Sequence, residues 1–355
     1  MSHTYNEIIS QPAGWAETAA AIVAQTAAVR QAWDTLRPTN ILCAGCGSTY
    51  YLSAVAAALL QSETGIPARG IPASELLLFP ELSLADPAGT LLVAISRSGT
   101  TTETLLAVER FRRAGGRAVW AITCYPESAL AAVADRVFVA AAAQETSVVQ
   151  TRSFSNMLLL AQGIAAAIGD EDVRLLQRLP EMGQALLDRV TEPMEALGRR
   201  TDLDRFFFLG SGLQYGIANE GMLKIKEMSL SHSETYHFLE FRHGPKSLVG
   251  KESLVAGLLS QEAYASERQV LEEMAQLGAT ILAITPGESL DGAAYSVSLP
   301  DILPAWARLP LYLIPLQLLA YYRTVSRNLD PDNPRNLGAV VFLDPAGFRQ
   351  HDTAR

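Results

Sequence analysis

Hydroxyl side chains gather in one short stretch, ISRSGTTTET at residues 95–104. The apolar run GTLLVA before it predicts a buried strand, and TETLLAVERFRRAGG continues with helical period and a glycine stop. The hydroxyls therefore fall where a helix begins, and the unpaired N–H groups and dipole of a helix start favour an anion. Ser96, Ser98 and Thr101 are candidate phosphate ligands, although a plain helix cap with spare polar residues would give the same pattern.

A second turn of this kind follows the earlier apolar run NILCAG. It holds Ser48 and Thr49 after the letters GCG, but Tyr50 occupies the third glycine position of the dinucleotide-binding fingerprint. We therefore expect no dinucleotide here. Two hydroxyl-bearing turns at the carboxyl edge of one parallel sheet favour a compact phosphate held between them.

Charged side chains that could move a proton lie in the second half, in NEGMLKIKEMS. If residues 218–229 are helical, Glu220, Lys224 and Glu227 share one face, and Lys226 points elsewhere. Such a ladder is often a solvated row of ion pairs, but the apolar residues around it indicate a helix buried on several sides. A buried carboxylate one turn from a lysine is a candidate general base beside a carbonyl.

Three of the five histidines lie just beyond this helix, at His232, His237 and His243. His243 precedes a Gly-Pro turn, which would fix its backbone and leave the ring projecting from a loop. Such a ring could shuttle a proton during sugar ring opening, or it could be an ordinary turn histidine. We expect no chemical role for His237 and favour none for His232.

The composition indicates a globular protein that acts on small molecules. The 355 residues are 49% hydrophobic and 18% charged, and the formal net charge is -9 without a basic cluster. We therefore expect no nucleic-acid partner, no membrane partner and a cytoplasmic location. Cys43 and Cys46 form a C-x-x-C without a second ligand pair, so we interpret them as structural and expect no metal and no cofactor.

The order of elements repeats along the chain. Strand, turn and helix in the first half return in RFFFLGSGLQYGIANEGMLKI and LVAGLLSQEAYASERQVLEEMAQLGATILAIT, offset by about 160 residues. This predicts a tandem duplication with two parallel α/β domains. We expect a helical arm at residues 1–39, a phosphate-binding domain at 40–170, and a domain with the acid-base residues and the C-terminal tail at 200–345. The arm carries an apolar helical stripe that ends at Pro38 and packs on its own chain or at an interface.

These features together resemble the sugar isomerase (SIS) family. The likeness rests on the two strand-turn-helix halves and on ISRSGTTTET, EGMLKIKE and FRHGPKSLV. It covers nearly the whole chain and is strongest to the isomerase part of glutamine:fructose-6-phosphate amidotransferases and to tagatose-6-phosphate ketose/aldose isomerases. It implies two tandem doubly wound, flavodoxin-like domains and a sugar-phosphate substrate.

The resemblance also implies roles for particular residues. Ser96, Ser98 and Thr101 would hold the phosphate with help from Ser48 and Thr49. Glu227 would move the C1/C2 proton, with Glu220 and Lys224 as supporting groups. His243 would open the sugar ring in the active site of a neighbouring subunit, which predicts a homodimer with shared sites.

Three departures from the family pattern bear on the reaction. The chain begins MSHT and is too short for a glutaminase domain, so we expect no ammonia derived from glutamine. The tail PRNLGAVV has Ala339 where the amidotransferases have a lysine that forms a Schiff base. In ETSVVQTRSF the usual phosphate-contacting hydroxyl is shifted, and Gln150 and Thr151 are unranked candidates.

Three classes of function remain open. The first is an isomerase for a hexose or amino-sugar 6-phosphate, with or without loss of the amino group. The second is a glutaminase-free aminotransferase or a fructosamine-6-phosphate deglycase that uses the same site. The third is a non-catalytic sugar-phosphate sensor, which Glu227 and His243 and the lack of a basic N-terminal module disfavour. The sequence does not identify the sugar and does not separate the first two classes, because both begin with proton transfer beside a carbonyl or imine.

Overall fold

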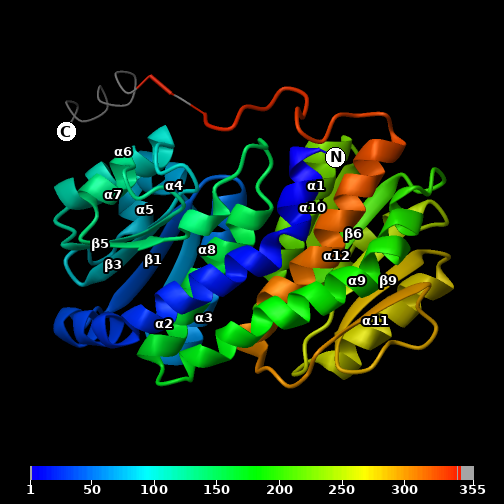
Figure 1. Cartoon of the computed structure of the whole chain (residues 1–355), viewed down its shortest axis with the longest axis horizontal. Coiled ribbons are helices and arrows are strands. Elements are labelled where there is room, and N and C mark those ends of the chain that lie inside the picture. Colours follow the sequence, from blue (N-terminus) through cyan, green and yellow to red (C-terminus); the bar gives the residue numbers. More distant parts are fainter. Residues whose placement is uncertain (1, 342, 345–355) are drawn as a thin grey trace.

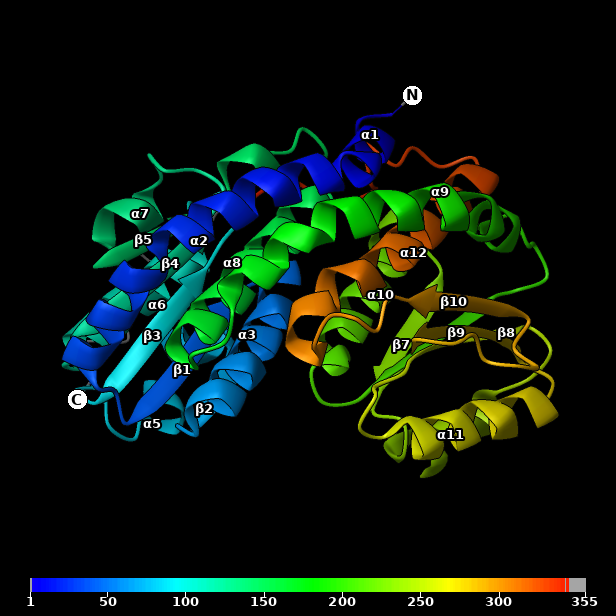
Figure 2. The same ribbon diagram turned by 60° about the horizontal axis from the view of Figure 1, so that its bottom comes forward.

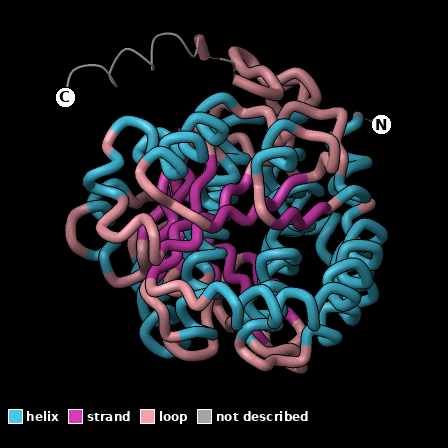
Figure 3. The backbone as a smooth tube through the Cα atoms, turned by 90° about the vertical axis from the view of Figure 1, so that its left-hand side faces the viewer, coloured by secondary structure: helices cyan, strands magenta, loops and turns pink. Residues whose placement is uncertain are grey.

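A computed structural model describes residues 2–341, 343 and 344 as two α/β domains that lie side by side (Figure 1). Strands lie in the interior and helices cover them (Figure 3). The predicted pair of tandem doubly wound parallel domains with an N-terminal helix is confirmed.

The first domain alternates strands and helices after the N-terminal helices. Its strands are β1 (Asn40–Gly45), β2 (Ala68–Pro72), β3 (Thr90–Ile95), β4 (Ala118–Thr123) and β5 (Arg136–Val139). Its helices are α3 (Ser48–Thr64), α4 (Ala73–Leu78), α5 (Pro80–Ser83), α6 (Thr102–Arg113), α7 (Ala129–Val133) and α8 (Arg152–Ile168), with a 3-10 turn at Ala141–Ala143. Every residue of β3 and β4 is buried, as expected for central strands covered on both faces.

The second domain repeats this order. Its strands are β6 (Arg205–Gly210), β7 (His232–Tyr236), β8 (Ser253–Leu258), β9 (Thr280–Pro286) and β10 (Tyr295–Leu299). Its helices are α10 (Gln214–Ser229), α11 (Tyr264–Gln276) and α12 (Ala305–Ser326), with 3-10 turns at Glu240–Arg242 and Pro245–Leu248. A 3-10 turn at Val173–Arg178 and α9 (Leu179–Gly198) connect the two domains.

Both sheets have the same strand order. The first runs β2-β1-β3-β4-β5, and the second, read from the other edge, runs β7-β6-β8-β9-β10 with all pairs parallel. The register also repeats, since Cys43 pairs with Val93 and Phe208 pairs with Ala256. In such sheets the strand order reverses beside the first strand, and ligands bind outside the carboxyl ends at that point. The turn after β1 and the loop after β3 both lie there.

The N-terminal helices α1 (His3–Ile9) and α2 (Gln11–Leu36) pack on the rest of the chain. α2 lies along α8 and also contacts α9 (Figure 2). Trp15 of α2 is fully buried and its indole N–H donates to Ser155 Oγ of α8 at 2.9 Å. The apolar stripe of this arm therefore packs within its own chain.

The two domains meet through α3 and α10, the first helix of each. Gly216 of α10 permits this contact, because a Cβ there would lie 2.3 Å from Val55 Cγ2 and 2.9 Å from the Tyr51 carbonyl oxygen of α3. The core continues across the contact, with Val55 and Ile217 fully or almost fully buried in one apolar cluster. The close approach places Ser48, in the first turn of α3, within hydrogen-bond distance of Glu220 and Lys224, which lie further along α10.

After α12 the chain continues as a tail whose described residues, 327–341, 343 and 344, form no helix or strand, and it runs from the second domain across to the first (Figure 1). Asp332 anchors its beginning, since the carboxylate accepts from the Thr4 N–H and the Thr4 hydroxyl of α1 at 2.8 and 2.7 Å.

Within the described residues, no helix combines the length and apolar character needed to cross a membrane.

Candidate active site

A pocket of about 180 Å³ lies at the predicted edge of the first sheet. Five segments line it: the turn at 46–49, residues 97, 98, 101 and 103 at the start of α6, residues 148–150, Glu227 of α10, and residues 337–341 of the tail. One pocket thus contains both hydroxyl turns of the first domain and a carboxylate of the second.

The hydroxyl loop after β3 presents two of its three predicted ligands to the pocket, Ser98 and Thr101. The Ser98 hydroxyl accepts bonds from the N–H and hydroxyl of Thr100 at 3.2 and 3.1 Å, so its own hydrogen remains available. No side chain caps α6, which leaves its first N–H groups for another acceptor. The start of α6 therefore has the donors that an oxyanion requires.

Ser96 lies behind this surface. It is 1% exposed, its Oγ accepts from the Gly99 N–H at 3.1 Å and lies 3.0 Å from Thr101 Oγ1, and it does not line the pocket. Gly99 has a φ of 62°, which suits glycine. Ser96 thus shapes the loop and positions Thr101.

The turn after β1 uses its two hydroxyls differently. Thr49 Oγ1 accepts from the Cys46 N–H and donates to the Cys46 carbonyl, both at 2.9 Å, so it closes the turn. Ser48 Oγ donates to Glu220 Oε1 at 3.0 Å and accepts from Lys224 Nζ at 3.1 Å. Both residues line the pocket, but the Ser48 hydroxyl is directed to the charged cluster of α10.

That cluster has the predicted face on α10. Lys224 Nζ lies 3.0 Å from Glu220 Oε1 and 2.8 Å from Glu227 Oε2. Glu220 and Lys224 are fully buried, whereas the Glu227 side chain is 22% exposed and borders the pocket. Lys226 points to solvent, as its place on the helix predicts.

Burial changes the pKa of Glu220 in this cluster. It raises the pKa of Glu220 to about 7, although Lys224 opposes this shift, and the second oxygen Oε2 has no hydrogen-bond partner. Burial by itself would lower the pKa of Lys224, but the two carboxylates outweigh it and raise that pKa, so the ammonium stays charged. A fixed cation between a partly protonated acid and a carboxylate at the pocket wall is suited to proton transfer.

His243 lies apart from the pocket within one chain. It follows the 3-10 turn Glu240–Arg242, its N–H donates to the Glu240 carbonyl at 2.9 Å, and its side chain is exposed. It is not among the described residues that line the pocket.

His237 stacks on Tyr215 with ring centroids 3.7 Å apart, and burial lowers the pKa of His237.

Of two further polar residues in the pocket, Glu103 was missed in the sequence and Gln150 was only an unranked candidate there. Glu103 lines the pocket with Oε2 buried and without a partner, and Gln150 does so with Oε1 in the same state. Thr151, the other candidate in that segment, is fully buried and donates to Glu145 Oε1 from its N–H and its hydroxyl at 2.8 and 2.9 Å. The position of Gln150 beside the buried Thr151 indicates that Gln150 is the one of the two that can contact a ligand.

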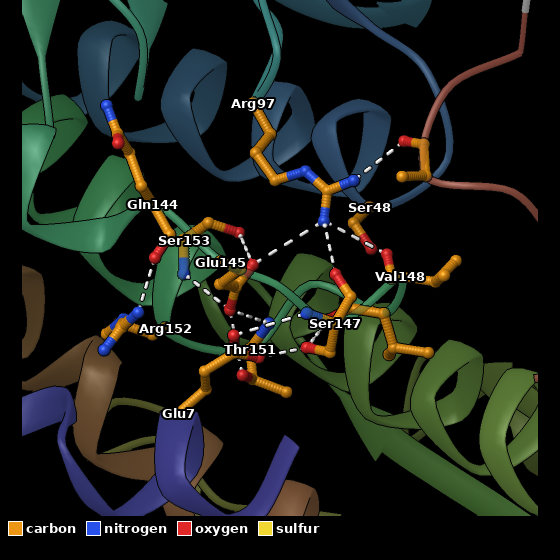
Figure 4. Close-up of polar contacts among 12 residues, drawn as sticks. Glu7, Ser48, Arg97, Gln144, Glu145, Ser147, Val148, Thr151, Arg152 and Ser153 are labelled. Atoms are coloured by element: carbon orange, nitrogen blue, oxygen red, sulfur yellow. Dashed lines mark hydrogen bonds and ion pairs between the residues drawn. The ribbon is translucent and has the colours of Figure 1, made fainter. Parts of the chain in front are cut away.

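Arg97 was also missed, although it is the one cation in the hydroxyl loop. Its guanidinium donates to the carbonyls of Ser147, Val148 and Ala339 and lies 3.7 Å from Glu145 Oε2 (Figure 4). The sequence feature that could have marked Arg97 is its positive charge within a run of hydroxyl residues. The carbonyls that accept from it lie 50 or more positions away, so the sequence pattern did not contain them.

The second domain has a matching loop after β8 that is already filled. Ser260 Oγ accepts from the Ala263 N–H at 3.1 Å, just as Ser96 Oγ accepts from Gly99. Here the carboxylate of Glu267, 2% exposed, accepts from the N–H and hydroxyl of Ser260 at 2.6 and 3.0 Å. An internal carboxylate thus occupies the donors of this loop.

The described residues contain no group of three or more histidine, cysteine or acidic side chains placed to hold a metal ion. Cys43, Cys46 and Cys124 are free thiols. Burial raises the pKa of Cys46, which borders the pocket, to about 11. This thiol is therefore a poor nucleophile near neutral pH.

Comparison with known proteins matches both domains to one family. A family model described as SIS domain matches residues 37–167 and 201–326. Glutamine–fructose-6-phosphate aminotransferase (isomerizing) from Legionella pneumophila is 32% identical over 314 residues, which are 86% of this chain and 51% of that protein. The chain spans about half the length of the curated relatives it matches.

Solved structures share the fold over nearly the whole chain. Glucosamine-6-phosphate deaminase from Thermotoga maritima superposes with a TM-score of 0.83 at 30% identity, covering 96% of this chain and 100% of that one. Tagatose-6-phosphate ketose/aldose isomerase from Escherichia coli has the same fold, with a TM-score of 0.84 at 24% identity over 97% of this chain and 96% of that one. Because the family model matches most of the chain in two segments that coincide with the two sheets, the chain belongs to the SIS domain family.

Proposed function

We propose that this protein is a sugar-phosphate isomerase that acts on a hexose or amino-sugar 6-phosphate by moving a proton between C1 and C2. One observation carries the proposal: Ser98 and Thr101 at the uncapped start of α6 and the Glu227 carboxylate line the same pocket. A phosphate at the helix start would hold one end of an open-chain sugar, and a carboxylate would face the other.

In this mechanism Glu227 is the base and Lys224 is its partner. Glu227 takes the proton from the hydroxyl-bearing carbon beside the carbonyl and returns it to the carbonyl carbon, while the hydroxyl proton passes to the carbonyl oxygen, so the reaction needs no external oxidant or reductant. Lys224 Nζ lies 2.8 Å from Glu227 Oε2 and orients this carboxylate, and Glu220 with Ser48 fixes the ammonium in place. Ser96 and Thr49 hold the two turns in shape.

His243 is proposed to reach the site of a neighbouring subunit in a homodimer and to open the sugar ring there. Its exposed position outside the pocket of its own chain agrees with this role. Ring opening moves a proton from the anomeric hydroxyl to the ring oxygen, and an imidazole can donate and accept near neutral pH.

A second candidate, deamination of a 2-amino sugar 6-phosphate, uses the same first step. After the proton moves from C2 to C1, the ketimine takes up water and releases ammonia, leaving the ketose phosphate. Two unpartnered acceptors on the pocket wall, Glu103 Oε2 and Gln150 Oε1, favour a substrate that brings hydrogen-bond donors such as an ammonium group. The deaminase that superposes over 96% of this chain adds support.

One experiment separates these reactions. Purified protein is incubated with hexose 6-phosphates and their 2-amino counterparts in deuterated water, and products are followed by NMR together with an ammonia assay. Isomerisation gives the partner sugar with deuterium at C1 or C2 and no ammonia, whereas deamination gives ketose phosphate and ammonia in equal amounts. Glu227→Gln is the control for contaminating activity. If no sugar phosphate exchanges its proton or binds, the proposal is wrong and a different class of ligand must be sought.

A further inference from the structure

Arg97 connects three segments that are remote in sequence. Its side chain is almost fully buried, and it lies between Ser96 and Ser98 in the hydroxyl loop. The guanidinium donates to the Ala339 carbonyl at 2.7 Å, and to the carbonyls of Val148 and Ser147 at 3.1 and 3.3 Å (Figure 4). A planar guanidinium can bind several carbonyls at fixed angles, which a lysine ammonium cannot do.

The carboxylate of Glu145 balances the positive charge of Arg97. The side chain of Glu145 is completely buried, and its Oε2 lies 3.7 Å from the guanidinium. Glu145 is itself fixed, because the N–H groups of Thr151 and Ser153 donate to its Oε1 at 2.8 and 3.0 Å. A buried cation with these partners has a single arrangement, so Arg97 acts as a rigid link.

The third segment that Arg97 contacts is residues 337–341 of the tail. This segment covers the pocket and is called the roof below. Residues 337–341 line the pocket with mostly apolar side chains, and they lie in the described part of the tail, which forms no helix or strand. Asp332 fixes the beginning of the tail to α1, and the Leu343 N–H donates to Thr102 Oγ1 of α6 at 3.3 Å. Between these points, the hydrogen bond from Arg97 to the Ala339 carbonyl joins residues 337–341 to the hydroxyl loop.

We infer that Arg97 is a positioning residue that holds residues 337–341 over the pocket and couples their closure to the loop of Ser98 and Thr101. An anion bound at that loop fixes the backbone of residues 96–101. The hydrogen bond from Arg97 then holds Ala339 in place as well. The roof then excludes water from the carboxylate of Glu227, where a proton must move without leaking to solvent. The structural part of this inference stands without the proposed function, and only its kinetic consequence rests on that function.

Hydrogen–deuterium exchange of the tail amides tests the structural part. Three variants are compared with the unaltered protein: Arg97→Met, Arg97→Lys, and the control Arg268→Met, which removes an exposed arginine paired with Glu272. Loss of a hydrogen bond to a charged donor should speed exchange of the peptide that holds residues 337–341 by roughly ten-fold or more in Arg97→Met. Arg97→Lys, which keeps the charge and a single point of attachment, should restore part of the protection. Arg268→Met should leave tail exchange unchanged.

Inorganic phosphate provides the test of coupling. Added phosphate should slow tail exchange in the unaltered protein and in Arg268→Met, and it should have no such effect in Arg97→Met. The inference is overturned if a folded Arg97→Met protein keeps tail protection, or if phosphate protects the tail equally with and without Arg97. If Arg97→Met does not fold, a chain that ends at Asn336 is used instead, because it lacks Ala339, which accepts the hydrogen bond from Arg97. That truncation should weaken phosphate binding, and unchanged phosphate affinity would overturn the inference.

Kinetics with a substrate give a separate readout. Arg97→Met and the truncation after Asn336 should each raise KM by roughly ten-fold or more, and the double variant should be no worse than the truncation alone, because Arg97 then has no Ala339 to hold. Additive effects would contradict the coupling. If no sugar phosphate is converted at all, the proposed function fails while the exchange experiment still decides the role of Arg97.

Discussion

Ser48 of α3 donates its hydroxyl hydrogen to Glu220 Oε1 of α10 at 3.0 Å, although 172 positions separate the two residues. The same hydroxyl accepts from Lys224 at 3.1 Å, so one side chain of the first domain completes the charged cluster of the second. The duplicated domains therefore share a single site at the contact between their first helices.

Removal of this link should lower both stability and turnover. Ser48→Ala leaves a buried acceptor on Glu220 with one donor fewer, which should lower the free energy of unfolding by about 1–3 kcal/mol. Urea unfolding and steady-state kinetics measure the two effects. Ser53→Ala is the matched control, because the buried Ser53 hydroxyl donates only to the Thr49 carbonyl of its own helix. Equal turnover in the two variants would show that the link between domains has no part in the reaction.

Glu227→Gln should abolish proton transfer and leave the fold intact. The amide keeps the shape of the side chain and loses its basicity, so turnover should fall by a factor on the order of 10² to 10⁴. Exchange of the substrate C2 proton into deuterated water, followed by NMR, is the direct measurement. Lys226→Gln, on the exposed face of the same helix, is the control and should exchange normally. Normal exchange in Glu227→Gln would exclude Glu227 as the base.

An oxyanion should bind at the start of α6 and not at the start of α11. Ser98→Ala and Thr101→Val each remove a donor to a charged ligand, which should raise KM or the phosphate Kd by roughly ten- to a hundred-fold. Ser260→Ala, in the equivalent loop of the second domain, should leave substrate binding unchanged because Glu267 fills that loop. In crystals grown with sulfate, density at the second loop alone would contradict this assignment.

Glu220 should make stability depend on pH. Its pKa in the folded protein is about 7, above the value of about 4.3 for an exposed glutamate, so between these values the folded state binds more protons than the unfolded state. The stabilisation from the protonated form is complete below about pH 4 and is lost as the pH rises through about 7. Unfolding free energies of the unaltered protein should therefore fall more steeply over this window than those of Glu220→Gln. Parallel curves would show that Glu220 titrates normally.

The shared-site model predicts complementation between two inactive chains. His243→Ala and Glu227→Gln should each be inactive alone, and a mixed dimer should contain one site with Glu227 from one chain and His243 from the other. Subunit exchange of differently tagged chains, followed by activity measurement, tests this. If exchanged heterodimers remain inactive, or if the protein sediments as a monomer at working concentration, each site is completed within one chain.

The site was predictable from sequence where its chemistry depends on local spacing. Glu220, Lys224 and Glu227 share a face because a helix repeats every 3.6 residues, and that spacing is visible in the letters. Ser98 and Thr101 face the pocket because a strand followed by a helix places the intervening loop at the sheet edge. Glu103 was missed and Gln150 was left unranked, since a single polar residue beside a motif has no period that marks it.

By itself the sequence determined the two parallel α/β domains, their duplication and the hydroxyl loop at the start of α6, because apolar periodicity and turn residues act over a few neighbouring positions. Only the tertiary structure decided that the Ser48 hydroxyl faces Glu220, that Glu267 fills the second loop, and that the tail covers the pocket. The contact from Arg97 to Ala339 spans 242 positions. Such contacts depend on how whole elements pack, and the closeness of α3 and α10 at Gly216 is set by the shapes of both helices together.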